Sequence, residues 1–323
     1  MRVLVTGCAG FIGSHLCEKL LEDGHEVVGV DALTEYYDPG LKFKNLERCL
    51  DSSGFRFERC LITGLAPRWL EEAEWIFHLA AQPGIGASWG ADFETYLNLN
   101  VLNTQHLLEG VRSSSSLKRL VYASSSSIYG NTSVERVRED HLKAPYSPYG
   151  VTKLAAEQLC LLYAENFGIP AISLRLFTVF GPRQRPDMFF SNLISAALTG
   201  RRFILHGDGT IQRDFTSVFD VVDAFKLAAG APIDRGTFNI AGGQAISMNA
   251  AIGMVEDIAG TRISIERRSE KKGDVRRTAA DISEAGRRLG FHPHRDLREG
   301  LREQIEFTDK LLALSMALSG PAC

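Results

Sequence analysis

The sequence predicts an α/β fold in which a doubly wound parallel sheet is joined to a smaller C-terminal lobe. Three observations support this fold class. Short apolar runs alternate with longer segments of helical periodicity through the first 180 residues, and such alternation builds parallel sheets covered by helices. A glycine-rich turn joins the first apolar run to the first helical segment. After Gly181 the alternation stops, and shorter, irregular elements follow.

The N-terminal segment has the layout of a dinucleotide-binding turn. The expected elements are a strand, a helix and a second strand, at residues 2–6, 14–23 and 26–30. Gly7, Gly10 and Gly13 have the spacing GxxGxxG, and glycines in such a turn let backbone amides approach a pyrophosphate at the N-terminus of the helix. Asp31, after the second strand, can accept hydrogen bonds from an adenosine ribose and would repel a 2′-phosphate. The layout therefore predicts a Rossmann-type fold that binds NAD in preference to NADP.

The alternation of strands and helices continues from residue 55 to residue 177. Runs such as WIFHLA and LVYAS are short and apolar, as is typical of buried parallel strands. The further strands are expected at 55–62, 75–80, 120–124 and 171–177, and the helices at 93–112 and from 149 onward. In the C-terminal part we expect a strand at 203–206 and helices at 190–198, 220–229, 248–259 and 297–314.

These elements divide into two expected units. Residues 1–180, with returning segments near 211–243, are expected to form the NAD-binding domain. Residues 181–210 and 244–323 are expected to form a lobe that binds the substrate.

Composition excludes several classes of protein. The chain has 323 residues, of which 45% are hydrophobic and 23% charged, and its net charge is -3. Such a chain is typical of soluble globular proteins and gives no electrostatic reason to expect nucleic acid or a membrane surface as a partner. The six cysteines form no CxxC pair, and the histidines do not cluster at ligand spacing. We therefore expect reduced, mostly buried thiols, a cytoplasmic location and no metal site.

Tyr149 and Lys153 are the first candidates for chemistry. They lie four residues apart at the start of an expected helix, so they share one face of it. An ammonium group beside a phenol favours the phenolate and lowers its pKa from about 10. This spacing alone is common and weak. The serine run 124–127, however, lies at the carboxyl end of an expected strand, where ligands bind in such sheets. A hydroxyl there can bond a substrate oxygen whose proton Tyr149 removes.

Several stretches together resemble the extended short-chain dehydrogenase/reductases, the NAD-dependent epimerase/dehydratase family. They are the glycine turn at 6–13, HLAA at 78–81, the serine run that ends in Tyr129 and Gly130, and YGVTK at 149–153. The segment 205–220, with GDG and RDF, resembles the part of these proteins that binds a sugar nucleotide. Within the family, YYDP at 36–39 and FTVFGP at 177–182, leading into RPDM, are similar to UDP-glucuronate 4-epimerases.

The resemblance implies conversion of UDP-glucuronate to UDP-galacturonate with NAD, through a transient 4-keto sugar and without loss of CO2. Tyr149 would take the proton of the C4 hydroxyl, Lys153 would lower the pKa of Tyr149 and hold the nicotinamide ribose, and Ser125 would share the C4 oxygen. The resemblance also assigns Gly7, Gly10, Phe11, Ile12, Gly13, Asp31, Leu61, Leu79, Ala80, Ala81 and Asn100 to the cofactor. It assigns Ser125, Ser126, Ser127, Thr178, Arg185, Arg213, Asp274 and Arg276 to the UDP-sugar.

The 4-keto form of UDP-glucuronate is a β-keto acid, so an epimerase must hold its carboxylate in a position that suppresses loss of CO2. Arg185, Thr178 and the hydroxyls of Ser126 and Ser127 are the candidate groups, since a charge-assisted bond from arginine is strong. The related decarboxylases and 4,6-dehydratases carry an acidic residue after the catalytic hydroxyl. This chain has Ser126 and Ser127 there, which favours the epimerase.

The chain also departs from the family pattern. Cys60 stands where an aspartate usually ends the third strand, the run 83–86 lacks a common arginine, and Asn103 replaces a usual glycine. UDP-glucose or UDP-N-acetylglucosamine 4-epimerase remains the first alternative, weakened by Thr178 in place of asparagine. UDP-glucuronate decarboxylase and a non-catalytic NAD-binding sensor are more distant. The resemblance further implies a homodimer, formed by the helices at 93–112 and 149–167.

Overall fold

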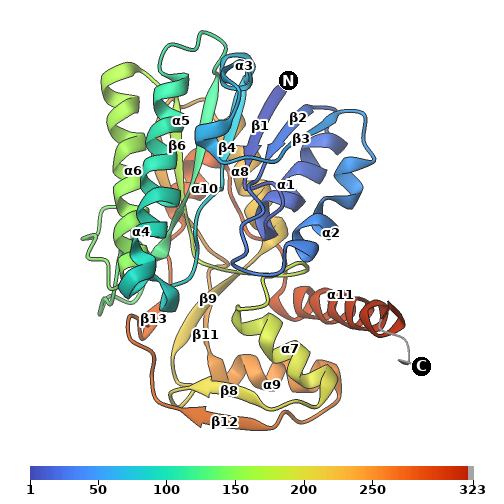
Figure 1. Cartoon of the computed structure of the whole chain (residues 1–323). Coiled ribbons are helices and arrows are strands. Elements are labelled where there is room, and N and C mark those ends of the chain that lie inside the picture. The colour runs from blue at the N-terminus through green and yellow to red at the C-terminus, as the bar shows by residue number, and fades with distance from the viewer. Residues whose placement is uncertain (319–323) are drawn as a thin grey trace.

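A seven-stranded parallel sheet forms the centre of the larger part of the molecule (Figure 1). The computed structural model describes residues 1–318, with side chains as far as Leu314. The strands are β1 (Arg2–Thr6), β2 (Glu26–Val30), β3 (Phe55–Glu58), β4 (Trp75–His78), β5 (Arg119–Ser125), β6 (Ala171–Leu176) and β10 (Gly236–Ile240). They pair in the order β3-β2-β1-β4-β5-β6-β10, and every neighbouring pair is parallel. The order runs outward from β1 in both directions, which confirms the predicted doubly wound α/β fold.

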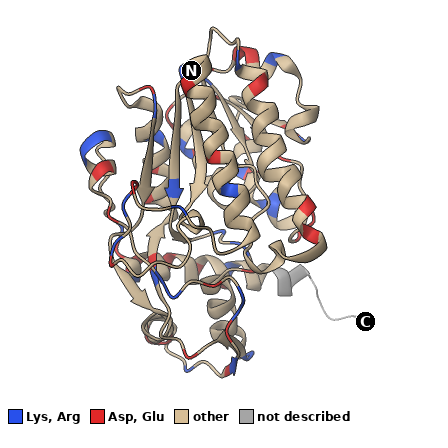
Figure 2. Ribbon diagram, turned by 90° about the vertical axis from the view of Figure 1, so that its left-hand side faces the viewer, with Lys and Arg blue, Asp and Glu red and all other residues tan. Residues whose placement is uncertain are grey.

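Helices cover both faces of this sheet. They are α1 (Phe11–Glu22), α2 (Pro39–Leu50), α3 (Pro67–Glu72), α5 (Asn103–Val111), α6 (Pro148–Phe167), α8 (Val218–Gly230) and α10 (Ser283–Leu289). One apolar core contains side chains of α1, α2, α8 and α10, and a second core contains side chains of α3, α5 and α6. Figure 1 shows α5 and α6 on one side of the sheet and α1 and α2 on the other. On the outside, basic and acidic residues are interspersed (Figure 2).

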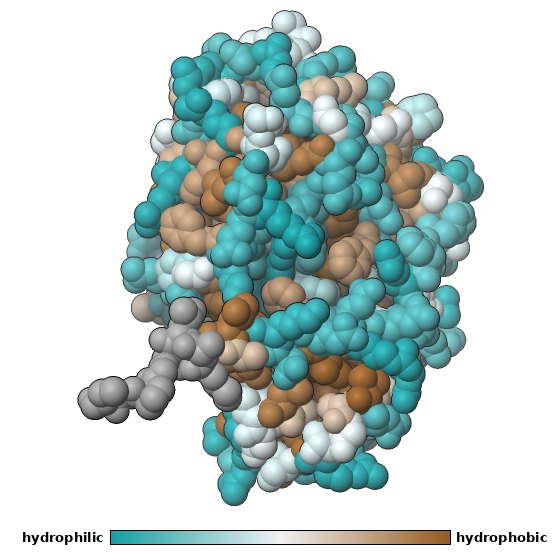
Figure 3. Space-filling view, turned by 90° about the vertical axis from the view of Figure 1, so that its right-hand side faces the viewer, coloured by the Kyte–Doolittle hydropathy of each residue, from teal (hydrophilic) through white to brown (hydrophobic). Residues whose placement is uncertain are grey.

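The smaller lobe has its own core and lies below the sheet in Figure 1. Its helices are α7 (Phe189–Thr199), α9 (Met248–Ala259) and α11 (Leu297–Leu318). Its strands are β7 (Thr178–Phe180), β8 (Phe203–His206), β9 (Gln212–Ser217), β11 (Ala245–Ser247), β12 (Ile265–Arg268) and β13 (Arg277–Thr278). The centre of the core is aromatic, with the rings of Phe190 and Phe215 4.6 Å apart. On the side of α2 and α11, hydrophobic residues gather at the surface of this lobe beside hydrophilic ones (Figure 3).

The segments after residue 181 return to the sheet more than once. Strand β10 lies beside β6, and α8 packs on α1. Helix α10 also belongs to the core of the large sheet, although it follows residue 244. The division of the chain into 1–180 with 211–243, and 181–210 with 244–323, stays a prediction.

Three expected elements differ from the structure. Helix α1 begins at Phe11, three residues before the expected start, because the extended Gly10 ends the turn. Strand β3 ends at Glu58, and the chain then forms a 3-10 turn over Ile62–Gly64. The expected helix 93–112 is interrupted, since a π-helical segment (Leu97–Leu102) separates α4 (Phe93–Tyr96) from α5. Further 3-10 turns are Gly86–Ser88, Gly90–Asp92 and Ser126–Ile128.

The described cysteines are all free thiols. Those buried in the structure are Cys8, Cys17, Cys49 and Cys160; Cys60 is partly exposed, and Cys323 lies outside the described residues. Within residues 1–318, no helix is both long and apolar enough to cross a membrane.

A buried ion pair joins α6 to the centre of the sheet. Arg175 of β6 donates three hydrogen bonds to the carboxylate of Glu157 on α6, at 2.7 to 3.3 Å, and both side chains are almost fully buried. Ser124 of β5 donates to the same carboxylate at 2.6 Å, and Arg175 also donates to the Tyr129 hydroxyl at 2.6 Å. Because the guanidinium and the carboxylate are surrounded by these partners, neither charge is left uncompensated inside the protein.

Removing one partner of this pair should destabilise the protein strongly. In Glu157→Leu or Arg175→Met, the remaining charge stays buried without its partner, and we expect the free energy of unfolding to fall by about 3–5 kcal/mol. The double variant should lose less than the sum of the two single variants, because it leaves no unpaired charge. Denaturant titrations of the four proteins measure the coupling. Glu284→Leu, which breaks the exposed pair with Arg287, is the control, with an expected cost of about 0–1 kcal/mol.

Candidate active site

A cleft of about 920 Å³ opens at the carboxyl edge of the sheet and extends into the smaller lobe. The turns that follow β1, β4 and β5 line it from the sheet, and residues of β7, β8 and β9 line it from the lobe. Of the predicted site residues, the cleft is lined by Gly7, Gly10, Phe11, Ile12, Gly13, Asp31, Leu61, Leu79, Ala80, Ala81, Ser125, Ser126, Ser127, Tyr149, Lys153, Thr178, Arg185, Arg213 and Asp274. Asn100 and Arg276 lie outside this lining.

The glycine turn brings three backbone segments into close contact. Gly7 has a φ of +74°, and a Cβ there would lie 2.8 Å from the backbone nitrogen of Ala80. A Cβ on Gly13 would lie 2.1 Å from the Gly7 carbonyl oxygen. Only glycine therefore allows α1 to start directly against this turn, with the free N–H groups of its first turn at the cleft. This arrangement suits a pyrophosphate, as the spacing predicts.

Asp31 follows β2 directly and contacts the glycine turn. It accepts hydrogen bonds from the backbone N–H groups of Ala9 at 3.2 Å and Leu33 at 2.8 Å, and burial raises the pKa of its carboxyl. Lys42 of α2 also lines the cleft, and its charge opposes this shift in the pKa of Asp31. Lys42 donates to the Thr34 carbonyl at 2.6 Å and lies over the ring of Tyr37. Lys42 was not among the predicted site residues. It lies in the first turn of α2, which begins at Pro39 in the segment after Asp31.

The predicted catalytic groups meet in the cleft. Tyr149 begins α6, and its ring packs edge to face on Tyr96. Ser125 ends β5, and its hydroxyl lies close enough to the Tyr149 phenol to lower the pKa of Tyr149. Lys153 is 3% exposed; it donates to the Ala123 carbonyl at 2.5 Å and lies over the ring of Tyr122. The phenol and the serine hydroxyl can thus act on one substrate oxygen.

The charges around Tyr149 differ from the expectation based on the YxxxK spacing. Burial raises the pKa of Tyr149, and this effect exceeds the lowering by Ser125 and by the positive charge of Arg185. Burial also lowers the pKa of Lys153 to about 7, and the ammonium is bonded to a backbone carbonyl. The positive charge that acts on the phenol in this structure is therefore that of Arg185.

Asn100 and His78 form a buried polar layer behind the cleft. Asn100, in the π-helical segment, accepts from the backbone N–H of Gln82 at 2.6 Å and donates to the hydroxyl of Thr152 at 3.0 Å. Burial lowers the pKa of His78 to about 3, and its two ring nitrogens bond the hydroxyls of Thr6 and Thr104. Asn100 therefore connects the segment after β4 to α6, and His78 connects β1 to α5.

The carboxylates that line the cleft already have partners. Asp187 forms two hydrogen bonds with Arg185, each at 3.0 Å, and Asp274 bonds Arg213 at 2.5 Å. Asp31, the third, accepts the two backbone N–H groups. None of these three is free to act as a general acid or base beside Tyr149.

Arg276 is placed differently from the prediction. Its side chain is exposed, while its backbone carbonyl accepts from the N–H of Gln212 at 3.0 Å. The next two residues form β13, which pairs with β9, the strand that carries Arg213. Arg213 and Asp274 thus line the cleft at this point, and Arg276 does not.

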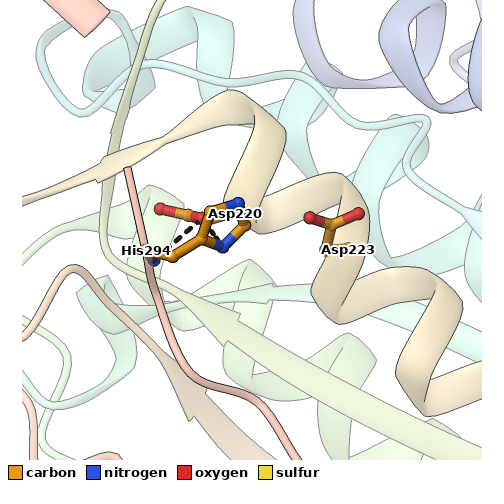
Figure 4. Close-up of side chains that lie close together, drawn as sticks. All are labelled: Asp220, Asp223 and His294. Carbon is orange, nitrogen blue, oxygen red and sulfur yellow. Dashed lines mark hydrogen bonds and ion pairs between the residues drawn. The ribbon is translucent and has the colours of Figure 1, made fainter. Parts of the chain in front are cut away.

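One group of His and Asp side chains within the described residues has metal-ligand spacing, but it lies away from the cleft. Asp220, Asp223 and His294 approach one another beside α8 (Figure 4). The Asp220 carboxylate accepts from the backbone N–H groups of His294 at 3.2 Å and Arg295 at 3.3 Å, and it pairs with the His294 ring at 3.1 Å. These contacts anchor the segment between α10 and α11 to α8, which explains why the side chains lie together.

Comparison with known proteins finds relatives that match almost the whole chain. The family model for the NAD dependent epimerase/dehydratase family matches residues 3–241. A protein of Bacillus subtilis, described as an uncharacterized UDP-glucose epimerase, is 42% identical over 96% of this chain and 99% of its own length. The UDP-glucuronate 4-epimerase of Thermodesulfobacterium geofontis is 35% identical over 96% of this chain and 97% of its own.

The fold is similar to solved structures as well. The UDP-glucuronic acid 4-epimerase of Bacillus cereus, in complex with UDP-glucuronic acid and NAD, superposes with a TM-score of 0.93. It is 40% identical and covers 96% of this chain and 100% of its own.

Replacing Lys153 with Met tests the cost of burying its ammonium. Between pH 7 and 10.5 the folded protein should bind fewer protons at Lys153 than the unfolded chain, since burial lowers this pKa from 10.5 to about 7. Stability therefore rises with pH across that window. We expect the free energy of unfolding of Lys153→Met, relative to wild type, to be highest at and below pH 7 and to fall as the pH approaches 10.5. Denaturant titrations at a series of pH values measure this difference.

Lys310→Met, at an exposed position on α11, is the matched control for the change of lysine to methionine. A difference between Lys153→Met and wild type that stays constant with pH would contradict the prediction.

Proposed function

The chain belongs to the NAD-dependent epimerase/dehydratase family, and on that premise we propose that it interconverts UDP-glucuronate and UDP-galacturonate by epimerisation at C4. One observation carries the choice of substrate. Arg185 lines the same cleft as Tyr149, and its charge reaches the phenol. An arginine placed beside the acid/base suits a sugar that carries a carboxylate next to C4.

The cleft fits NAD along the sheet. The free N–H groups at the start of α1 would hold the pyrophosphate, and Asp31 with Lys42 would hold the adenosine ribose. Lys153, on α6, would hold the nicotinamide ribose. Bound NAD would accept hydride from C4 and return it to the opposite face of the ring. A 2′-phosphate would meet the Asp31 carboxylate, which favours NAD over NADP.

Tyr149 and Ser125 supply the proton transfer at the C4 oxygen. Tyr149 takes the hydroxyl proton as C4 is oxidised and gives it back as C4 is reduced, and Ser125 bonds the same oxygen. Arg185 is the positive group that stabilises the phenolate in this structure. The same guanidinium therefore serves the acid/base and faces the sugar.

The C5 carboxylate must be held while C4 is a ketone. Loss of CO2 requires the bond between C5 and the carboxyl carbon to align with the π-system of the ketone. Arg185 and Thr178 lie on the lobe side of the cleft and Ser126 and Ser127 on the sheet side, so they would bond the carboxylate from two directions. Such bonds would keep the carboxylate out of that alignment.

A decarboxylase or 4,6-dehydratase is disfavoured by the charges in the cleft. Those reactions need a carboxyl group free to move a proton at C5 or C6. Ser126 and Ser127 follow the catalytic hydroxyl, and Asp31, Asp187 and Asp274 are occupied by the partners described above. A non-catalytic sensor is disfavoured because Tyr149, Lys153 and Ser125 are all present in the cleft.

UDP-glucose is a second candidate substrate. Asp187 already neutralises Arg185, so a neutral sugar would leave no unpaired guanidinium. The similar Bacillus subtilis protein is described as a UDP-glucose epimerase.

We expect the enzyme to work as a cytoplasmic homodimer. The free thiols suit a reducing compartment. Large apolar side chains are exposed along the helices at 93–112 and 149–167, where the family resemblance implies the dimer contact. They are Leu97, Leu102, Val151, Leu162 and Phe167, each 39–53% exposed. A partner's helices would cover them in a four-helix bundle.

Incubation of the protein with NAD and UDP-glucuronate tests the proposed function. We expect UDP-galacturonate and no UDP-pentose, with the two separated by chromatography. Tyr149→Phe should lower turnover by about 10²–10⁴-fold, since it removes the general acid/base. UDP-xylose as the main product, or turnover of UDP-glucose alone, would overturn the proposal.

Arg185→Ala tests the grip on the carboxylate. We expect kcat/KM for UDP-glucuronate to fall about 10–100-fold, as for loss of a hydrogen bond to a charged group. We expect kcat/KM for UDP-glucose to fall less, because this substrate loses only the positive charge beside the Tyr149 phenol. Arg138→Ala is the control, because Arg138 also pairs with an aspartate two residues later but lies on the surface. Equal losses on both substrates would show that Arg185 does not hold the carboxylate.

Leu162→Asp tests the dimer. A carboxylate at this position of α6 would be buried by the partner's helices, so we expect the variant to be monomeric by light scattering. Leu314→Asp, at an exposed position on α11, is the control. A wild-type protein that is monomeric at micromolar concentration would contradict the expectation.

A further inference from the structure

The motif YYDP at 36–39 has a feature that the proposed function leaves unexplained. Tyr37 lies under the ammonium of Lys42, Asp38 caps α2 by accepting from the N–H of Gly40 at 2.8 Å, and Pro39 is the first residue of that helix. Each of these three has a local role in the loop and helix after β2. Tyr36 has none there, and its side chain lines the cleft.

Tyr36 reaches across the cleft to Asp187. Its hydroxyl donates to Asp187 Oδ2 at 3.5 Å, the long end of hydrogen-bond distances. Its position is also set by packing, since a Cβ built on Gly84 would lie 2.3 Å from the same hydroxyl. Gly84 is in turn held by Tyr96, whose hydroxyl donates to the Gly84 carbonyl at 2.8 Å. The phenol of Tyr36 is thus confined between a rigid backbone segment and the Asp187 carboxylate.

Asp187 occupies one edge of the Arg185 guanidinium. Nε donates to Oδ1 and Nη2 donates to Oδ2, each at 3.0 Å, which is the bidentate geometry that restricts the plane of a guanidinium. Arginine has five N–H donors, so three remain. Among the described residues, no hydrogen bond uses Nη1. The free edge, made by Nη1 and the second N–H of Nη2, is the one available to a ligand in the cleft.

The chain around Arg185 is also held firmly. Gln184 donates to the Val179 carbonyl at 2.9 Å and accepts from Gln304 at 2.9 Å. Asn192 donates to the Pro186 carbonyl at 2.6 Å. With the backbone anchored on both sides, the orientation of the long Arg185 side chain depends on Asp187, and that of Asp187 on Tyr36.

We propose that Tyr36 and Asp187 are positioning residues that hold the free edge of Arg185 toward the C5 carboxylate of the substrate, and so make the enzyme selective for the acidic sugar and resistant to losing CO2. The inference rests on the proposed function. It assigns Tyr36 and Asp187 no contact with the reacting atoms. Their effect passes through the direction in which Arg185 points.

The consequence of a loosely held Arg185 follows from the chemistry of the 4-keto sugar. If the carboxylate turns into alignment with the ketone, the bond between C5 and the carboxyl carbon breaks, and CO2 leaves. The electron pair of that bond enters the enolate across C5 and C4, and a proton from solvent then adds at C5. The hydride taken from C4 stays on the cofactor, so each such event yields one CO2, one UDP-4-keto-pentose and one NADH.

Asp187→Asn and Tyr36→Phe test the proposal in the NAD-loaded protein. For Asp187→Asn we expect kcat/KM for UDP-glucuronate to fall about tenfold, the effect of one charged hydrogen bond, and to fall more than kcat/KM for UDP-glucose. The share of turnovers that release CO2 and accumulate NADH should rise in both variants, and less in Tyr36→Phe, which removes only a hydroxyl. A residue that merely supported the fold would lower both activities and leave this share unchanged.

Two surface variants are matched controls. Asp140→Asn breaks an exposed Arg–Asp pair of the same spacing, and Tyr146→Phe removes the hydroxyl of an exposed tyrosine outside the cleft. Neither should change the ratio of the two substrates or the release of CO2.

The outcomes separate the positioning role from the proposed function. If wild type converts UDP-glucuronate but both variants keep its substrate ratio and its product, the positioning role is overturned and the proposed function stands. A higher kcat/KM for UDP-glucuronate in Asp187→Asn would show that Asp187 competes with the substrate for Arg185, which also overturns the role. If wild type acts on UDP-glucose only, the proposed function fails and the positioning role fails with it.

Discussion

The buried pair of Glu157 and Arg175 is the contact on which the active-site geometry depends. Glu157 is on the helix that presents Tyr149 and Lys153, and Arg175 is on the strand next to the one that ends in Ser125. Two charges in an apolar interior need a close, well-oriented partner, so the register of α6 against the strands has little freedom. This constraint sets where the phenol and the serine hydroxyl meet.

The same principle extends into the cleft, where charges are paired before any ligand arrives. Arg185 with Asp187 and Arg213 with Asp274 are ion pairs whose arginines are largely buried. A paired arginine keeps its orientation and still has free N–H donors, so an anionic ligand meets a prepared surface. The Tyr149 phenol gains as well, because a positive charge stays beside it although Lys153 is bonded to a backbone carbonyl.

Patterns among neighbouring residues predicted the strands, turns and helices that such neighbours determine. The strand at 2–6, the glycine turn and the helix at 248–259 follow from apolar runs, backbone freedom and periodicity, and they match the structure. The short strands β11 and β13 carry no periodic signal, since two or three residues are too few. In the π-helical segment, Asn100 bonds Gln82 and Thr152, which are distant from it in the sequence. Helical periodicity carries no information about such contacts.

The candidate site shows the same division. Spacing along one helix or one turn was enough to find Tyr149, Lys153 and the glycines. Tyr36 and Asp187 are 151 residues apart in sequence, so only the fold brings them together. The exposure of the Arg276 side chain could not be read from its residue type either, and its contact with the UDP-sugar stays a prediction. Burial decides that the pKa of Tyr149 is raised, and a sequence gives no measure of how deeply a side chain is buried.

The loop that carries Arg185 connects the substrate side of the cleft to the cofactor side. Arg183 takes a left-handed backbone conformation, with φ of 65°, which is uncommon for a residue with a side chain. In this conformation its guanidinium bonds Glu18 at 2.6 Å on α1. His15 of the same helix bonds the Pro182 carbonyl at 3.0 Å, and burial lowers its pKa to about 4, so the ring is neutral at physiological pH. Since the first residues of α1 line the cleft, the helix that would hold the cofactor also supports the loop from which Arg185 would reach the sugar.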